Sequence, residues 1–172
     1  LMESDRVTAH RAPLFALIAA NAISRAGNVV TAIAVPWYVL DTTGSAAKTG
    51  LAGFAGAVPV VISLLFGGTL VDRFSYRRVS VASDLASAVC VALIPLLAMT
   101  VGLPFWALLV CVFLGALLDI PGSLARMAML PDLAGRAGMR MERAYSLDET
   151  APLIASLVGP ALTGVLIVTL GA

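Results

Sequence analysis

The chain has 172 residues, of which 60% are hydrophobic and only 12% are charged, and its mean hydropathy is +0.99. Soluble domains contain about 45–50% apolar and about 25% charged residues, so this composition excludes an ordinary soluble globule. The formal net charge of +1 gives no broad basic or acidic field, and nucleic acid is therefore not expected as a partner. The lipid bilayer is the expected surrounding.

Five apolar stretches are long enough to cross a bilayer as helices, since about 20 apolar residues span a hydrocarbon core of about 30 Å. They lack the alternating polar pattern of a membrane barrel, which favours an all-α fold. Thr100, Gly102 and Pro104 place a turn inside one long charge-free run and divide it into two spans. The predicted spans are 13–40, 49–71, 79–101, 104–124 and 147–171.

The first span follows an N-terminal tail, residues 1–12, and contains a single charge, Arg25. That residue lies about 18 Å into the helix at about 1.5 Å per residue, close to the bilayer midplane. An Arg costs about 2.5–3.5 kcal/mol there on insertion scales, so it needs water or a partner. Steps of three and four residues place five polar residues on one stripe of this helix: Asn21, Ser24, Arg25, Asn28 and Thr31.

We therefore expect Asn21, Arg25 and Asn28 to line a watery substrate or coupling pathway. The alternative is structural, with Arg25 bonding backbone carbonyls and the two amides packing between helices. No carboxylate is expected at the depth of Arg25, so its charged partner is expected in a segment outside this sequence.

The short loop between the second and third spans carries Asp72, Arg73, Arg77 and Arg78. Two further acids, Asp84 and Asp119, are expected near the same ends of the third and fourth spans. The short loop makes the two helices antiparallel neighbours, so these acids and bases can form a network that locks the helix ends. The alternative is a set of ordinary topogenic arginines with two acids near the interface.

The basic residues predict that the N-terminus is cytoplasmic. If the tail and the loops after the second and fourth spans share one side, this side collects every arginine except Arg25, and the other side has only Lys48. Ala172 is then outside. The connector 126–145 mixes methionines with arginines and is expected to be an amphipathic segment on anionic lipid, or else a plain solvated loop.

The fifth span contains Gly159 and Pro160, which together remove a backbone donor and weaken the helix. A bend is expected there, either as a static kink or as a moving hinge. Cys90 and Cys111 lie in apolar runs and are expected to be small buried side chains, not a disulfide or a metal pair. Because the chain stops directly after this span, we expect it to be a piece of a longer protein.

Residues 67–78 resemble the signature between the second and third helices of the major facilitator superfamily of secondary transporters: a glycine, then Asp-Arg, then a basic pair. The branch of macrolide and siderophore (enterobactin-type) exporters is suggested by 24–28, by Val35-Pro36-Trp37 and by 130–133. The Gly-Pro core of 156–164 is similar to a motif that exporters carry.

This resemblance implies twelve helices in two six-helix bundles with a substrate cavity between them. The chain would hold five helices of the first bundle, and the second bundle would be its missing partner. The implied activity is proton-coupled export of a drug-like or siderophore-like small molecule by alternating access, in the bacterial inner membrane and without a cofactor. The residues that would form a gating network stabilising the outward-open state are Asp72, Arg73, Arg77, Arg78 and Asp119.

Two other functions are alternatives to transport. Residues 122–126, followed by Gly135, resemble part of the CDP-alcohol phosphotransferase signature, but that chemistry needs several carboxylates to hold a divalent metal. The flanking positions here are Leu118, Pro121, Met139 and Arg143. An enzyme and a metal site are therefore not expected. A non-transporting membrane scaffold or sensor stays as the alternative, and it predicts that Arg25→Ala and Asp72→Asn leave efflux unchanged.

Overall fold

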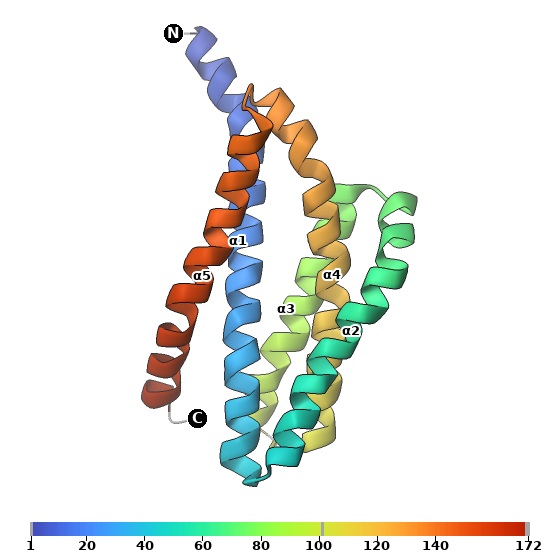
Figure 1. Cartoon of the computed structure of the whole chain (residues 1–172), viewed down its shortest axis with the longest axis vertical. Helices are drawn as coiled ribbons and strands as arrows, with labels where there is room; N and C mark the ends of the chain where they lie inside the picture. Colours follow the sequence, from blue (N-terminus) through green and yellow to red (C-terminus); the bar gives the residue numbers. More distant parts are fainter. Residues whose placement is uncertain (1, 101, 171–172) are drawn as a thin grey trace.

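The computed structural model describes residues 2–100 and 102–170, with side chains described from residue 11 onward except at 64, 66–73, 151, 162 and 166–170. Within these residues every regular element is a helix, which confirms the predicted all-α fold. The helices are α1 (Met2–Thr43), α2 (Ala46–Arg73), α3 (Tyr76–Thr100), α4 (Phe105–Arg136) and α5 (Met141–Leu170) (Figure 1).

Four of these helices contain a candidate membrane span among the described residues: Arg11–Thr43, Ala46–Ser63, Tyr76–Thr100 and Phe105–Arg136. Large apolar side chains point outward on the bundle, among them Met99 and Leu157 with exposed fractions of 86% and 79%. A surface of this kind suits acyl chains. The crossing by α5 stays a prediction, because its last side chains are not among those described.

The connector between α4 and α5 is much shorter than the sequence indicated. Helix α4 continues to Arg136, so only residues 137–140 link it to α5. Gly138 ends α4 with a φ of 61°, and the N–H groups of Gly138 and Met139 donate to the carbonyls of Gly135 and Ala134 at 3.1 and 2.9 Å. This is a Schellman motif. The expected connector 126–145, as an amphipathic segment on lipid or a solvated loop, is therefore wrong. Residues 126–136 belong to α4 and residues 141–145 to α5, and Leu130, Ala134 and Ala144 pack in the bundle core.

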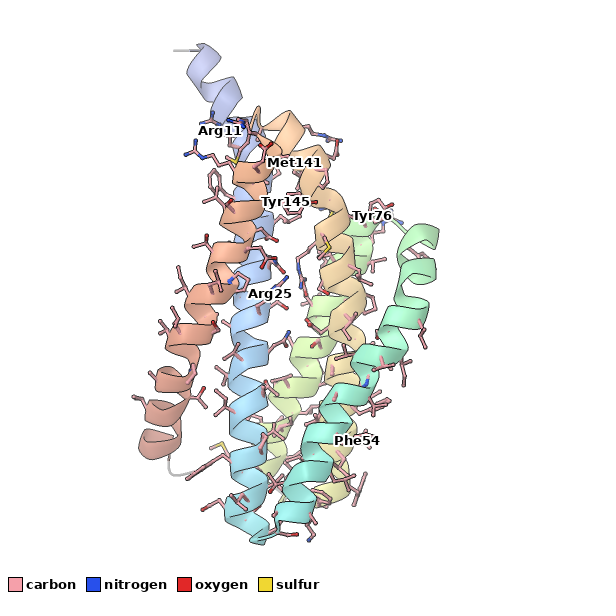
Figure 2. The ribbon with its side chains drawn as sticks, viewed as in Figure 1. Arg11, Arg25, Phe54, Tyr76, Met141 and Tyr145 are labelled. Carbon is pink, nitrogen blue, oxygen red and sulfur yellow. The ribbon has the colours of Figure 1, made fainter. Side chains whose placement is uncertain are left out.

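The helices form two groups (Figure 1). Helices α1 and α5 lie side by side and run parallel, whereas α2 and α3 both pack against α4. We call one end of the bundle the Arg11 end, because Arg11, Tyr76 and Met141 lie there (Figure 2). The opposite end, where Gly44 joins α1 to α2, is the Gly44 end.

Two apolar clusters hold the groups together, one near each end. The cluster at the Arg11 end joins α1, α4 and α5 and contains Leu14, Leu17, Leu130, Ala134, Ala137 and Ala144. The cluster at the Gly44 end joins α1, α2 and α4 and contains Val35, Val39, Ala52, Leu108 and Val112. The part of the α1–α4 seam between these clusters is polar, and it holds the candidate site.

Helices α3 and α4 pack closely along glycines seven residues apart on one face of α4. A Cβ on Gly115 would lie 3.6 Å from Cβ of Cys90, and a Cβ on Gly122 would lie 2.9 Å from Cβ of Ser83. Small residues allow this approach in membrane helices. Cys111 is buried, as the sequence predicted, whereas Cys90 is only half-buried; both are free thiols in the structure.

Candidate functional site: a polar layer across four helices

Arg126 is the centre of a buried polar cluster. Its side chain is only 2% exposed. The Nε atom donates to Oδ1 of Asn21 at 3.2 Å, and Nη2 donates to Oγ of Ser24 at 3.3 Å. The Nη1 atom makes a short hydrogen bond and ion pair with Oδ1 of Asp84. Each guanidinium nitrogen of this buried cation is therefore bonded, as burial of a charge requires.

Gly122 explains how Asp84 reaches Arg126. It lies one helical turn before Arg126 on the same face of α4. A Cβ on Gly122 would lie 3.3 Å from Oδ1 of Asp84 and 3.5 Å from Nη1 of Arg126. Because glycine has no side chain, α3 comes close enough for the ion pair to form.

Asp119 lies two helical turns before Arg126 on α4, on the same face of the helix. It is buried, with 9% of its surface exposed. Its Oδ1 accepts a hydrogen bond from Oγ of Ser24 at 2.9 Å, and its Oδ2 accepts one from Nδ2 of Asn28 at 2.8 Å. Ser24 thus connects Arg126 to Asp119, since its hydroxyl accepts from the first and donates to the second.

Asp148 brings α5 into the same cluster. Its side chain is buried, and its Oδ1 accepts a hydrogen bond from Nδ2 of Asn21 at 2.9 Å. The Asn21 amide therefore bridges Arg126 and Asp148. We define the polar layer as seven side chains from α1, α3, α4 and α5: Asn21, Ser24, Asn28, Asp84, Asp119, Arg126 and Asp148.

The polar layer contains more acid than base. Its one guanidinium is paired with Asp84, while the described hydrogen bonds of Asp119 and Asp148 come from neutral donors. Removing one partner of a buried ion pair typically destabilises a protein by about 3–5 kcal/mol, because the other charge stays buried. Such clusters are rare within membrane spans and commonly mark ion or substrate pathways.

Arg25 lies beside this layer on α1, between the two ends of the bundle (Figure 2). Its Nη2 atom is 3.9 Å from Oε1 of Glu149 on α5, and the two side chains are 36% and 60% exposed. The expectation that no carboxylate matches its depth is wrong. Helix α5 begins at Met141, so Glu149 lies two turns inside the helix, not at its start.

The predicted gating residues do not form one cluster in the described part of the chain. Arg77 and Arg78 are exposed at the start of α3, and the side chains of Asp72 and Arg73 lie outside the described residues. Asp119 bonds α1, far along α4 from the helix end where the prediction placed it. The two acids Asp84 and Asp119 thus belong to the polar layer.

A cavity of about 1120 Å³ leads from the Arg11 end toward the polar layer, between α1, α3 and α4. Arg126 lies on its wall together with Arg77 and the pair Arg136–Asp132, whose Nη2 and Oδ2 atoms are 2.7 Å apart. Arg126 thus lies where this cavity meets the polar layer, with 2% of its side chain exposed.

Gly159 and Pro160 lie within an uninterrupted α5. Gly159 is buried, and a Cβ there would lie 2.6 Å from Cγ1 of Val29. This glycine therefore sets the close approach of α5 to α1. The bend expected at Pro160 stays a prediction.

Sequence reasoning missed Arg126 and Asp148 as site residues. The signal was present: Asn21, Ser24 and Asn28 share one face of α1, and Asp119 and Arg126 share one face of α4, seven residues apart. Two complementary polar faces of this kind are expected to meet.

Comparisons with known proteins identify the family of this chain. Residues 17–172 match the Major Facilitator Superfamily, and the chain belongs to this superfamily, as its residues 67–78 predicted. The chain is 40% identical over 164 residues to the multidrug efflux pump Tap of Mycolicibacterium fortuitum, covering 94% of this chain and 40% of that protein. No solved structure gives a significant match.

More distant relatives carry related names. The staphyloferrin A transporter of Staphylococcus aureus is 25% identical over 142 residues, covering 82% of this chain and 35% of that protein. The macrolide efflux protein A of Streptococcus pyogenes is 24% identical over 152 residues, covering 88% and 37%. The chain thus spans about two fifths of the length of these curated relatives. The superfamily consists of transporters, so the phosphotransferase alternative is rejected.

Proposed function

We propose that the complete protein exports drug-like or siderophore-like small molecules from a bacterium, in exchange for protons and by alternating access. The observation that carries the proposal is the polar layer, which contains three carboxylates and one guanidinium where α1 meets α4 and α5 and where α3 meets α4. The relatives named as a multidrug efflux pump, a siderophore transporter and a macrolide efflux protein support export of small organic molecules.

The substrate or coupling pathway is proposed to include Asn21, Arg25 and Asn28. Asn28 and Arg25 retain exposed surface in the described chain, while Asn21 connects the pathway to Arg126. A guanidinium that is only loosely paired at 3.9 Å can exchange its carboxylate for an acidic or polar group of a substrate. The second six-helix bundle of the superfamily would close the other side of this pathway.

The Arg11 end is proposed to face the cytoplasm of a bacterial inner membrane. Arginines gather on the helix ends and turns there, as the positive-inside rule expects of a cytoplasmic side. They are Arg11, Arg77, Arg78, Arg136, Arg140 and Arg143. The gating role of Asp72, Arg73, Arg77 and Arg78 is proposed for the same end, where the second bundle would meet the α2–α3 turn.

The proposal is tested by expressing the complete protein in a bacterial strain that lacks its main efflux pumps. Ethidium and the macrolide erythromycin serve as probes, and their efflux is followed before and after a protonophore collapses the proton gradient. We expect efflux that stops when the gradient is lost. Efflux that continues without a gradient would exclude proton coupling.

The scaffold or sensor alternative predicts a different outcome of the same experiment. It expects no ethidium or erythromycin efflux and no effect of Arg25→Ala or Asp72→Asn. The transporter proposal expects Arg25→Ala to abolish efflux and Asp72→Asn to change the balance between inward-open and outward-open states.

A further inference from the structure

Among the acids of the polar layer, Asp119 is the deepest, and like Asp148 it accepts its described hydrogen bonds from neutral donors. It lies about 21 Å from the start of α4 and about 26 Å from its end, at about 1.5 Å per residue. Asp148 lies only about 11 Å from the start of α5. Asp84 is paired directly with Arg126, whereas Asp119 accepts hydrogen bonds from the neutral side chains of Ser24 and Asn28.

We propose that Asp119 is the side chain that binds and releases the coupling proton, and that its protonation state controls the contact between α1 and α4. This inference rests on the proton-coupled export proposed above and assigns one residue to that step.

The charged and titratable side chains of the layer and its surroundings come from α1, α3, α4 and α5. Helix α2 contacts α4 through Ser63, whose Oγ donates to the Leu117 carbonyl at 3.3 Å, and the described part of α2 brings no titratable group to the layer. The groups from the other helices are Arg25 of α1, Asp84 of α3, Arg126 of α4, and Asp148 and Glu149 of α5.

The charges of these groups leave Asp119 as a surplus acid. Arg126 is matched by Asp84 and Arg25 by Glu149, so two carboxylates, Asp119 and Asp148, exceed the cations. A proton that neutralises one of them reduces repulsion inside the layer. Asp119 is the one held between the two helix groups, because both of its hydrogen-bond donors belong to α1.

Both oxygens of Asp119 accept a hydrogen bond from α1, and an ionised carboxylate is an acceptor at both oxygens. A proton delivered by water bonds to one carboxylate oxygen and turns that oxygen into a donor. The neutral carboxyl group still accepts, but more weakly than the carboxylate, so a proton on Oδ2 weakens the hydrogen bond from Nδ2 of Asn28 between α1 and α4. A proton on Oδ1 weakens the hydrogen bond from the Ser24 hydroxyl in the same way. Release of the proton to water restores both bonds to their full strength.

The same change is transmitted to Arg126 through Ser24. When Asp119 is ionised, the Ser24 hydroxyl hydrogen points to Asp119 and its lone pair receives Nη2 of Arg126. The cavity at the Arg11 end has Arg126, one member of this chain of bonds, in its wall. Proton uptake therefore weakens the polar seam between the two apolar clusters, where α1 and α4 would separate.

The test uses the complete protein in liposomes, with ethidium as the substrate probe and a trapped pH-sensitive dye to follow protons. We expect Asp119→Asn to bind ethidium as the wild type does but to lose ethidium-driven proton movement. Asp119→Glu, which keeps an acid, is expected to retain proton movement with a shifted pH dependence. Asp41→Asn is the matched control, because Asp41 is exposed near the end of α1, and it should behave as the wild type.

A second measurement needs no variant and covers the case in which Asp119→Asn fails to fold. Dicyclohexylcarbodiimide reacts with protonated carboxyl groups in apolar surroundings, and the labelled residue is found by mass spectrometry. We expect Asp119 to be labelled, and we expect the labelling to decrease as the pH rises and when ethidium is added. Labelling that is confined to Asp148 or Glu149 would overturn the assignment.

The outcomes separate this inference from the proposed function. Wild-type proton movement that persists in Asp119→Asn refutes the role of Asp119 and leaves proton-coupled export standing. Loss of proton movement in Asp148→Asn, with normal movement in Asp119→Asn, transfers the role to Asp148. A wild-type protein that exports ethidium without moving protons refutes the coupling and this inference together.

Discussion

Gly122 and Asp84 lie so close that a methyl group on the glycine would stand 3.3 Å from Oδ1 of the aspartate. The same methyl group would lie 2.9 Å from Cβ of Ser83, which is shorter than real Cβ contacts. The absence of a side chain at this one position therefore joins two features: the close packing of α3 on α4 and the ion pair of Arg126.

We expect Gly122→Ala to lower the stability of the complete protein by about 1–3 kcal/mol, as overpacking typically does. Thermal unfolding in detergent, followed by a thiol-reactive dye, would measure the change. Gly135→Ala is the matched control, since Gly135 is also in α4 and a Cβ there meets nothing within 4 Å. Equal melting temperatures for the two variants would contradict the packing argument.

The ion pair between Arg126 and Asp84 is expected to be essential for folding. Asp84→Asn leaves the buried guanidinium without its ionised partner, and the expected destabilisation is about 3–5 kcal/mol. Asp132→Asn is the comparison, because its pair with Arg136 is on the surface and such pairs contribute about 0–1 kcal/mol. Unfolding by heat or denaturant would measure the loss of stability in each of the two variants. A similar loss for both would mean that Arg126 is less buried than the structure indicates.

The contact between α5 and α1 gives a prediction that includes a rescue. Gly159→Ala places a methyl group 2.6 Å from Cγ1 of Val29, so we expect the two helices to be forced apart and stability to fall. Val29→Ala in the same protein removes that atom and should recover most of the loss. Gly164→Ala is the control in the same helix, because a Cβ there meets nothing within 4 Å. If Val29→Ala does not restore the stability lost in Gly159→Ala, the close contact between α1 and α5 does not lie at these two residues.

The sequence was sufficient for the all-α class, the order of the five helices and the family, because uncharged apolar runs and residues 67–78 are local signals. The sequence was insufficient to predict the polar layer, because the ends of the spans are predicted from the positions of charged residues. By this criterion the fourth span ends at Leu124, and Arg126 falls in a loop instead of in α4. The real end of α4 is set by the backbone conformation of Gly138, which no count of charges detects.

Side-chain partners on different helices are equally difficult to predict from local sequence patterns. The sequence places Glu149 at the start of the fifth span, away from Arg25, and so predicts that the partner of Arg25 is outside this chain. The parallel course of α1 and α5 brings the two side chains together. The polar stripe of α1 did predict that Asn21 is shielded from lipid, and Asn21 is 4% exposed. What a stripe cannot specify is which helix faces it.

The half-exposed pair of Arg25 and Glu149 leads to a prediction that separates function from stability. The two atoms are 3.9 Å apart and both side chains retain exposed surface, so the pair should contribute no more than about 1 kcal/mol to folding. We expect Arg25→Ala to leave the melting temperature nearly unchanged but to abolish ethidium efflux by the complete protein. Arg25→Lys keeps the charge and should retain part of the efflux. A variant Arg25→Ala that melts early and still exports ethidium would assign this arginine to structure instead of the pathway.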